Sequence, residues 1–282
     1  NHFDAYSEPF GDYSSLLSFQ VCKNAKSKFN VVLGGDGGDE IFWGYPRFLR
    51  FVSHSNWFKI PSRNLFASIL RKFGYEISYG ISSNSIQQWS LIHHSQNNYE
   101  IINKILPNKL NSNELLNIYD DRLKFKNQKE ILFWLRQNEF YGHMQRVLLK
   151  MDRASMYHGL EYRVPLLDKK ILEFSSRVEP ELSSRHHIPK YMLKELMKKK
   201  YPKEIIQYEK KGFSFNLDKA LKKILKDEVF ALLVDQDPYP KNTFNRSELK
   251  NYIHSYYNHD HNNVWGIWVL YSLQKWSDKF LL

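Results

Sequence analysis

The segment Asn30-Val-Val-Leu-Gly-Gly-Asp-Gly-Gly-Asp-Glu-Ile-Phe-Trp-Gly-Tyr45 predicts the fold more clearly than any other stretch of the chain. Residues 30–33 form a short apolar run with two valines, and the run ends at Gly34. A strand that enters a glycine-rich turn is typical of an α/β unit whose ligand lies at the carboxyl end of the strand. We therefore expect a buried strand at residues 30–33, at the edge of a parallel sheet, and a helix beginning at Asp39.

The glycine turn offers two kinds of group that a nucleotide site needs. Gly34, Gly35 and Gly37 have no side chains, so backbone amides there can approach a phosphate closely. Asp36 and Asp39 are three residues apart, and carboxylates beside a phosphate suit a Mg²⁺ ion lying between them. A calcium loop or a tight structural connection would show the same pattern, and the turn taken alone leaves these alternatives open.

The composition is that of a folding chain with a basic surface. Of the 282 residues, 42% are hydrophobic and 16% aromatic, which is enough to bury a substantial core. The single cysteine, Cys22, excludes an intramolecular disulfide and any multi-cysteine metal site. We ascribe the net charge of +11 to a lysine-rich surface with a phosphate-handling site. Nucleic acid is not expected as a partner, because the sequence shows neither a basic recognition helix nor an aromatic RNA-binding motif.

The hydropathy pattern gives no indication of a membrane partner. The longest apolar run, residues 264–273, is about half of the roughly 20 residues that a bilayer span requires. No signal peptide is visible, and we expect a soluble, cytoplasmic protein.

The rest of the chain is divided by its hydrophobic periodicity. We expect residues 1–55 to be the remnant of a nucleotide-binding α/β core, and the polar residues 75–127 to be a peripheral insertion of short helices and loops. Residues 129–282 form the helical part, since apolar residues recur there at three- and four-residue steps. The fold class predicted for this chain is mainly α-helical with a remnant of a parallel sheet. Helices are expected at 14–28, 168–177, 189–200, 216–234, 246–257 and 263–280.

A charged segment at residues 146–168 is the second candidate region. It carries Lys150, Asp152 and Arg153, and later Glu161, Arg163 and Asp168. Such charges often form buried ion pairs that fix a helix–turn junction. We favour this structural role for the later three charges and a binding role for Asp152 and Arg153.

Two lysine motifs follow. Pro189 suits the first position of a helix, which would place Lys190 in the first turn. A cation there opposes the helix macrodipole; a solvated surface tolerates it, and an anion bound at the helix start explains it well. Further on, Lys210 and Lys211 precede Gly212. This pattern fits a second phosphate clamp and fits an exposed turn equally well.

Taken together and in this order, the motifs resemble the synthetase domain of the asparagine synthetase family. Members of that family usually carry motifs close to SGDGGDE-LFGGY, DRxSM…LExRVPFLD, GKxxLR and KQGF. The counterparts here are residues 34–45, 152–168, 189–194 and 210–213. The resemblance covers nearly all of residues 1–282, which would be the C-terminal part of such a domain. It implies the α/β fold of the adenine nucleotide alpha hydrolases, or PP-loop ATPases.

The resemblance implies a carbon–nitrogen ligase that uses ATP and Mg²⁺. A carboxylate substrate, aspartate or a related acid, attacks the α-phosphorus of ATP and gives an acyl-adenylate and magnesium pyrophosphate. Ammonia, free or derived from glutamine, then attacks the acyl carbon and releases AMP.

The resemblance also implies roles for particular residues. Asp36 matches the acid near the adenylate and the incoming amine, and Asp39 matches a ligand of magnesium pyrophosphate. Lys190 matches the lysine that neutralises charge developing on the phosphates, and with Asp36 it is a candidate catalytic residue. The remaining matches are Gly34, Gly35, Gly37 and Lys211 for ATP or pyrophosphate, and Lys150, Asp152 and Arg153 for the substrate.

The chain departs from the family pattern in several ways. Family members carry an SGGxDS pyrophosphate loop upstream, and many carry a glutaminase half with a catalytic cysteine; neither is in this sequence, and Cys22 lies in a predicted helix. Gly34 replaces the commoner serine, and Trp43 replaces a glycine. We therefore expect the chain to be inactive alone and to need its own missing N-terminal half or a glutaminase partner.

Two other functions remain open. One is an intramolecular amide former resembling β-lactam synthetase or a peptide cyclase, although Asp36 favours the asparagine synthetase side. The other is a non-catalytic binding or scaffold module. Retention of Asp36, Asp39 and Lys190 argues against a scaffold, while the missing loop argues for it.

Overall fold

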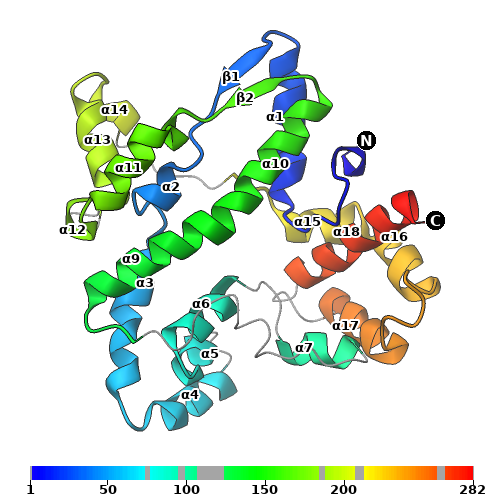
Figure 1. Ribbon diagram of the computed structural model, residues 1–282. Coiled ribbons are helices and arrows are strands. Elements are labelled where there is room, and N and C mark those ends of the chain that lie inside the picture. The colour runs from blue at the N-terminus through cyan, green and yellow to red at the C-terminus, as the bar shows by residue number, and fades with distance from the viewer. Residues whose placement is uncertain are drawn as a thin grey trace. The chain divides into compact units, whose positions relative to one another are not determined.

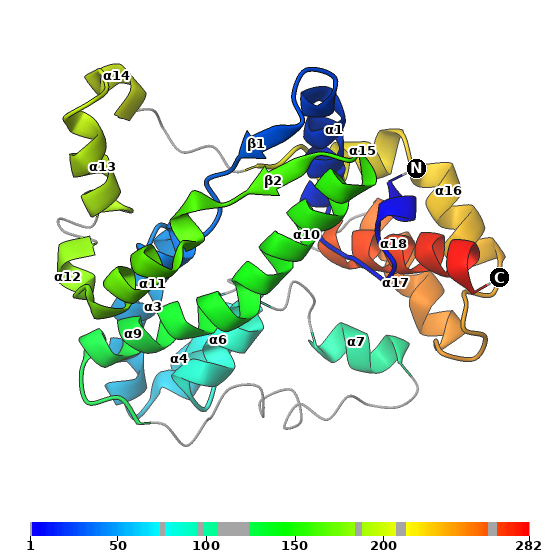
Figure 2. The same ribbon diagram turned by 45° about the horizontal axis from the view of Figure 1, so that its top comes forward.

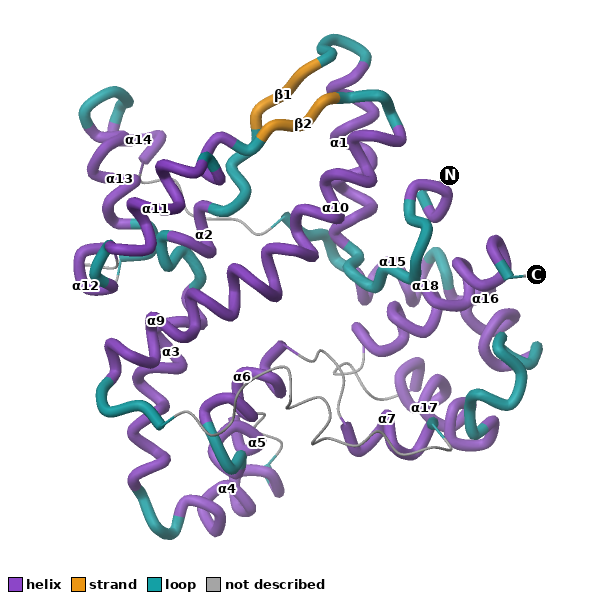
Figure 3. Tube along the Cα trace, viewed as in Figure 1, coloured by secondary structure: helices purple, strands orange, loops and turns teal. Residues whose placement is uncertain are grey.

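The computed structural model describes residues 2–73, 77–94, 99–106, 124–183, 188–206, 213–258 and 264–281. Helices make up most of these residues, so the expectation of a mainly helical chain is confirmed (Figures 1 and 3). The chain divides into two compact units. The terminal unit comprises Asn1–Asn24, Ser95–Leu115 and Gly212–Leu282, and the glycine-turn unit comprises Ala25–His94 and Leu116–Lys211.

A small parallel sheet lies in the glycine-turn unit. Strand β1 (Val31–Leu33) pairs with strand β2 (Glu161–Arg163), with Val32 opposite Tyr162. The two strands lie side by side in both ribbon views (Figures 1 and 2). The sequence predicted β1 but not β2, because a three-residue strand with a charge at each end has no apolar pattern of its own.

The prediction that β1 is buried is wrong. The side chains of Val31 and Leu33 are 43% and 71% exposed. Successive side chains of a strand point to opposite faces, so these two residues share the face on which Glu161 and Arg163 lie. All four residues of this face are exposed. The opposite face carries Val32 and Tyr162, which are partly buried.

The charges around β2 behave differently from the buried ion pairs that the sequence suggested. Glu161 and Arg163 do pair, at 2.8 Å, but their side chains are 55% and 63% exposed. They are two residues apart on a strand and therefore project from the same face. Asp168 caps helix α11 (Lys169–Arg177) by accepting a hydrogen bond from the Lys170 amide at 2.9 Å, which is a local structural role.

Helices surround an aromatic core in the glycine-turn unit. The cluster is built on Trp43, Phe48, Phe51 and Leu135, all nearly fully buried. Trp43 has a φ of 47°, a conformation that normally favours glycine, and its indole donates to the Leu132 carbonyl at 3.2 Å. The helices of this unit, besides α11, are α2 (Gly38–Ile41), α3 (Pro46–His54), α4 (Arg63–Lys72), α5 (Ile77–Ser82), α6 (Ile86–His94), α9 (Gln128–Asn138), α10 (Met144–Tyr157), α12 (Pro180–Ser183), α13 (Tyr191–Lys198) and α14 (Lys203–Ile206).

A π-helical turn, η3 (Glu139–His143), joins α9 to α10. The helical periodicity that begins at Glu130 does not distinguish a π turn from regular α-helix. A π turn inserts one extra residue into the helix and rotates the following side chains about the axis. The turn therefore decides which residues of α10 face the glycine turn, and no residue pattern in the sequence signals it.

The terminal unit has its own apolar core. Leu221, Val229, Leu249, Ile253 and Ile267 are all completely buried in it. Its helices are α7 (Tyr99–Ile105), α15 (Leu217–Lys223), α16 (Lys226–Phe230), α17 (Arg246–Asn258) and α18 (Val264–Phe280), and α1 (Ser14–Lys26) begins in this unit.

The helix expected at 216–234 is therefore broken into α15, α16 and the π-helical turn η6 (Ala231–Asp235), whereas those at 246–257 and 263–280 are confirmed. Part of the predicted insertion at 75–127 lies outside the described residues; the described part contains the short helices α5, α6 and α7. Across the described segments, no helix has both the length and the apolar character that crossing a membrane requires.

The terminal-unit core provides a matched stability test. Leu221 is fully buried, and Ile224, which follows one turn later, is 78% exposed. We expect Leu221→Ala to lower the free energy of unfolding by about 2–5 kcal/mol, because it removes apolar contacts and leaves a cavity. Ile224→Ala should change it by less than about 0.5 kcal/mol. Urea unfolding of both variants measures this, and equal losses would contradict the assigned core.

Candidate active site around the glycine turn

Two glycines of the turn are required by their surroundings. Gly37 has a φ of +85°, which strains any other residue. A Cβ atom on Gly34 would lie 1.7 Å from the hydroxyl oxygen of Tyr162, so any larger residue there would require the phenol to move. Gly35 differs, because a Cβ there would meet nothing within 4 Å. The backbone of the turn is therefore open at Gly35 and covered at Gly34.

Asp36 lies between a phenol and a buried lysine. The Tyr162 hydroxyl donates to Asp36 Oδ2 at 2.8 Å. Lys150 on α10 is only 8% exposed, and its positive charge acts on Asp36. Burial raises the pKa of the Asp36 carboxyl, and the charges of Glu40 and Asp39 add to the effect; Tyr162 and Lys150 oppose it. The result is a partly buried carboxyl group that holds a proton more readily than an ordinary aspartate.

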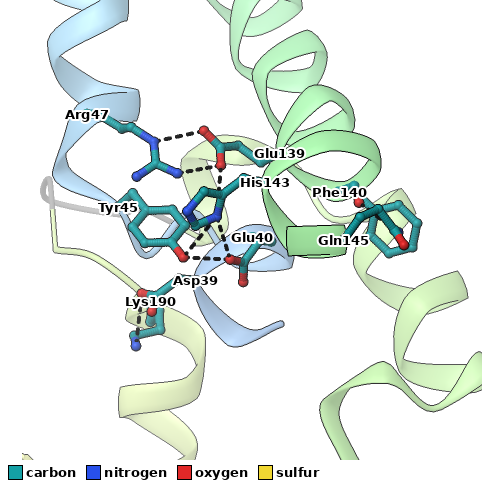
Figure 4. A network of polar contacts seen from close by, with 9 residues as sticks. All are labelled: Asp39, Glu40, Tyr45, Arg47, Glu139, Phe140, His143, Gln145 and Lys190. Atoms are coloured by element: carbon teal, nitrogen blue, oxygen red, sulfur yellow. Dashed lines mark hydrogen bonds and ion pairs between the residues drawn. The ribbon is translucent and has the colours of Figure 1, made fainter. Parts of the chain in front are cut away.

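Lys190 lies beside Asp39 although the two are far apart in sequence. Its Nζ is 3.0 Å from Asp39 Oδ1, and the two side chains are 29% and 23% exposed (Figure 4). Helix α13 begins only at Tyr191, so Pro189 is not its first residue as expected, and Lys190 is the N-cap with a φ of 55°. A left-handed conformation in a lysine costs on the order of 1 kcal/mol and is often found at functional sites.

Behind Asp39 lies a buried network of acids and bases, shown in Figure 4. Glu40 and Glu139 are each 2% exposed. Arg47 donates through Nε to Glu139 at 2.8 Å and makes a second contact to the same carboxylate. His143 Nδ1 lies 3.3 Å from Glu40 and 3.6 Å from Glu139. The π turn supplies both Glu139 and His143, and the network thereby ties this turn to α2 and α3.

Tyr45 completes the network. Its hydroxyl donates to Glu40 at 2.5 Å, and the Arg47 guanidinium lies 3.7 Å from the centre of its ring. Burial raises the pKa of the Tyr45 hydroxyl, and the negative charge of Glu40 raises it further. Tyr45 therefore stays protonated and remains a donor. The contact fixes Glu40, which is adjacent to Asp39 in α2.

The other predicted site residues are less closely grouped. Asp152 and Arg153 are exposed on α10. Asp152 is two residues from Lys150 and so projects from a different side of the helix. Lys211 lies outside the described residues.

Six residues of the site were not predicted from the sequence: Glu40, Tyr45, Arg47, Glu139, His143 and Tyr162. Glu40 lies inside the quoted motif, where its position next to Asp39 is a usable signal. Tyr162 lies in the predicted charged segment 146–168, but no pattern there marks it out, and nothing in the sequence links Glu139 or His143 to the turn.

Comparison with known proteins places these motifs in a family. The model of the asparagine synthase family matches residues 2–278, and the chain therefore belongs to this family, as the resemblance predicted. Asparagine synthetase (glutamine-hydrolyzing) 1 of Bacillus subtilis is 25% identical over 273 residues, covering 91% of this chain and 39% of the relative. A putative asparagine synthetase (glutamine-hydrolyzing) of Mycobacterium bovis is 22% identical over 223 residues, covering 73% and 33%.

A putative asparagine synthetase (glutamine-hydrolyzing) 2 of Methanocaldococcus jannaschii is 34% identical over 87 residues, or 31% of this chain and 16% of the relative. The chain thus spans less than two fifths of the length of these relatives. No solved structure matches the chain significantly.

The buried network generates a stability prediction. Arg47→Met keeps the apolar stem but leaves the Glu139 carboxylate buried with only part of its compensation, so we expect a loss of about 3–5 kcal/mol in the free energy of unfolding. The control is Lys198→Met, which breaks the exposed pair between Lys198 and Glu195 and should change the free energy of unfolding far less than Arg47→Met does. Chemical denaturation compares the two; a small loss for Arg47→Met would show that this ion pair is dispensable.

Proposed function

We propose that this chain forms part of the synthetase site of an ATP-dependent ligase that activates a carboxylate and transfers the acyl group to nitrogen. The observation that carries the proposal is the grouping of Asp36, Asp39, Lys150 and Lys190 at the glycine turn, from three separate segments of the chain. Membership of the asparagine synthase family supports the same reaction class and an α/β fold of the PP-loop type.

The charges of this group suit a polyphosphate substrate. The Lys190 ammonium is partly exposed, so it can contact phosphate oxygens, and positive charge placed there stabilises the negative charge that develops during displacement of pyrophosphate. Gly35 leaves open backbone in the glycine turn, which permits close approach of a ligand.

A divalent ion fits the donor set in part. Asp39 offers hard carboxylate oxygens, and within the described residues no group of three metal-binding side chains occurs. Mg²⁺ usually takes one or two protein carboxylates and completes its shell with water and phosphate oxygens, which matches this arrangement. In such a site Asp39 would hold the ion, which would neutralise charge on the pyrophosphate.

Asp36 has the properties of a proton acceptor for the incoming nitrogen. An ammonia or amine nucleophile must lose a proton after it attacks the acyl carbon. A carboxyl group whose pKa is raised by burial accepts that proton more readily than an ordinary aspartate. The relatives are named as glutamine-hydrolyzing asparagine synthetases, which supports aspartate as the carboxylate and glutamine as the nitrogen source.

Replacing Lys190 tests the electrostatic role. In the protein at its full natural length, Lys190→Ala should lower kcat about a hundredfold or more, because a transition-state charge partner contributes about 3 kcal/mol. Lys190→Arg should recover only part of the rate, since a planar guanidinium does not replace a compact ammonium. Lys200→Ala, at an exposed position ten residues further along the chain, is the control and should be near normal. Pyrophosphate release is measured at saturating ATP and aspartate; normal turnover of Lys190→Ala would reject this role.

A separate test concerns the metal role of Asp39. Asp39→Asn should raise the Mg²⁺ concentration needed for half-maximal pyrophosphate release, because an amide oxygen binds the ion more weakly than a carboxylate. Asp237→Asn, which removes a partly exposed carboxylate in the terminal unit, should leave the Mg²⁺ dependence unchanged. An unaltered Mg²⁺ titration for Asp39→Asn would exclude Asp39 as a ligand.

A further inference from the structure

Tyr162 has features that its place in a short strand does not explain. Its side chain leaves β2 on the face opposite to the exposed pair Glu161 and Arg163, and it extends over the glycine turn. A Cβ on Gly34 would lie 1.7 Å from the hydroxyl oxygen of Tyr162 and 2.1 Å from the ring carbon that bears it. The phenol therefore fills the space that any side chain at residue 34 would occupy.

The same hydroxyl fixes the carboxylate of the proposed site. It donates to Asp36 Oδ2 at 2.8 Å, which leaves the other carboxylate oxygen of Asp36 for a different partner. Lys150 places a positive charge near the same carboxylate. One phenol thus closes the volume next to Gly34 and orients Asp36, while the backbone at the next residue, Gly35, stays open.

We propose that Tyr162 is a positioning and specificity-determining residue: its hydroxyl orients Asp36, and its ring limits the size of the carboxylate substrate accepted beside Gly34. This inference rests on the proposed function, because it assumes that the acyl group lies at the glycine turn. The substrate class it predicts is a small carboxylate, such as a short amino acid, whose side chain does not need the space that the phenol occupies.

The first test measures steric coupling and requires no activity. Gly34→Ser should lower the melting temperature in the natural background, where the phenol occupies the space, and should have little effect on top of Tyr162→Ala. Gly35→Ser is the matched control, since its new side chain would enter open space and should leave the melting temperature nearly unchanged. If the losses in melting temperature caused by Gly34→Ser and Tyr162→Ala simply added in the double variant, the steric part of the proposal would be overturned.

The second test separates the hydroxyl from the ring. Tyr162→Phe keeps the ring and removes the hydrogen bond, so the pKa of Asp36, followed by NMR of ¹³C-labelled aspartate, should rise further above its ordinary value. The acidic limb of the kcat/KM profile should shift to higher pH with it, while the preference among carboxylates stays the same. A purely structural role for Tyr162 would leave the pKa of Asp36 and the pH profile unmoved.

The third test measures substrate size in the protein at full natural length. Tyr162→Ala should increase kcat/KM for a carboxylate longer by one or two methylene groups, relative to aspartate, by about tenfold or more, since pocket size discriminates on that scale. Pyrophosphate release with aspartate, glutamate and a six-carbon homologue gives the ratio. An active Tyr162→Ala enzyme with unchanged preference would overturn the specificity role.

These outcomes distinguish the inference from the function on which it rests. If the natural protein released pyrophosphate with no carboxylate, the proposed function and the specificity role would both fail. The steric coupling and the Asp36 titration would then still decide whether Tyr162 orients Asp36 as proposed.

Discussion

The parallel pairing of β1 with β2 is the interaction on which the site depends. Only three residues pair on each strand, yet the ladder continues into the turn, where the Gly34 amide donates to the Arg163 carbonyl at 2.8 Å. Because the register sets Val32 opposite Tyr162, the phenol reaches the end of β1 at Gly34 and Asp36. A slip of one residue would turn this side chain to the exposed face and remove it from the turn.

A second constraint holds the far end of the turn. Glu40 of α2 and Glu139 of the π turn are both buried, and a buried carboxylate is costly unless a cation or a donor compensates it. Arg47 and His143 contact Glu139, and Tyr45 and His143 contact Glu40, so most of this cost is offset. These contacts leave α2 little freedom. Asp39, which precedes Glu40, therefore presents its carboxylate to Lys190 in a defined position.

Local patterns predicted more of this chain than contacts between distant segments did. The first strand, the glycine turn and the long helices follow from apolar periodicity and from glycine, which are properties of neighbouring residues. The pairing partner β2, the exposure of Leu33 and the π turn depend on segments more than a hundred residues away or on helix phase. Likewise, the motifs predicted Asp36 and Lys190 as site residues but not Tyr162. The role of Tyr162 depends on its contacts with Gly34 and Asp36, which are far from it in sequence.

The ion pair between Asp39 and Lys190 suggests how such a site stays stable without ligand and still binds one. Each side chain is more than a fifth exposed, so separating the pair costs little in water-accessible surroundings. A magnesium–polyphosphate ligand carries charges of both signs. Its phosphate oxygens can replace Asp39 as the partner of Lys190, and its magnesium ion can replace Lys190 as the partner of Asp39. Phosphate without a metal would add negative charge close to Asp39 and the buried Glu40, and this repulsion disfavours the binding of phosphate alone. On this argument, metal and phosphate should enter the site together.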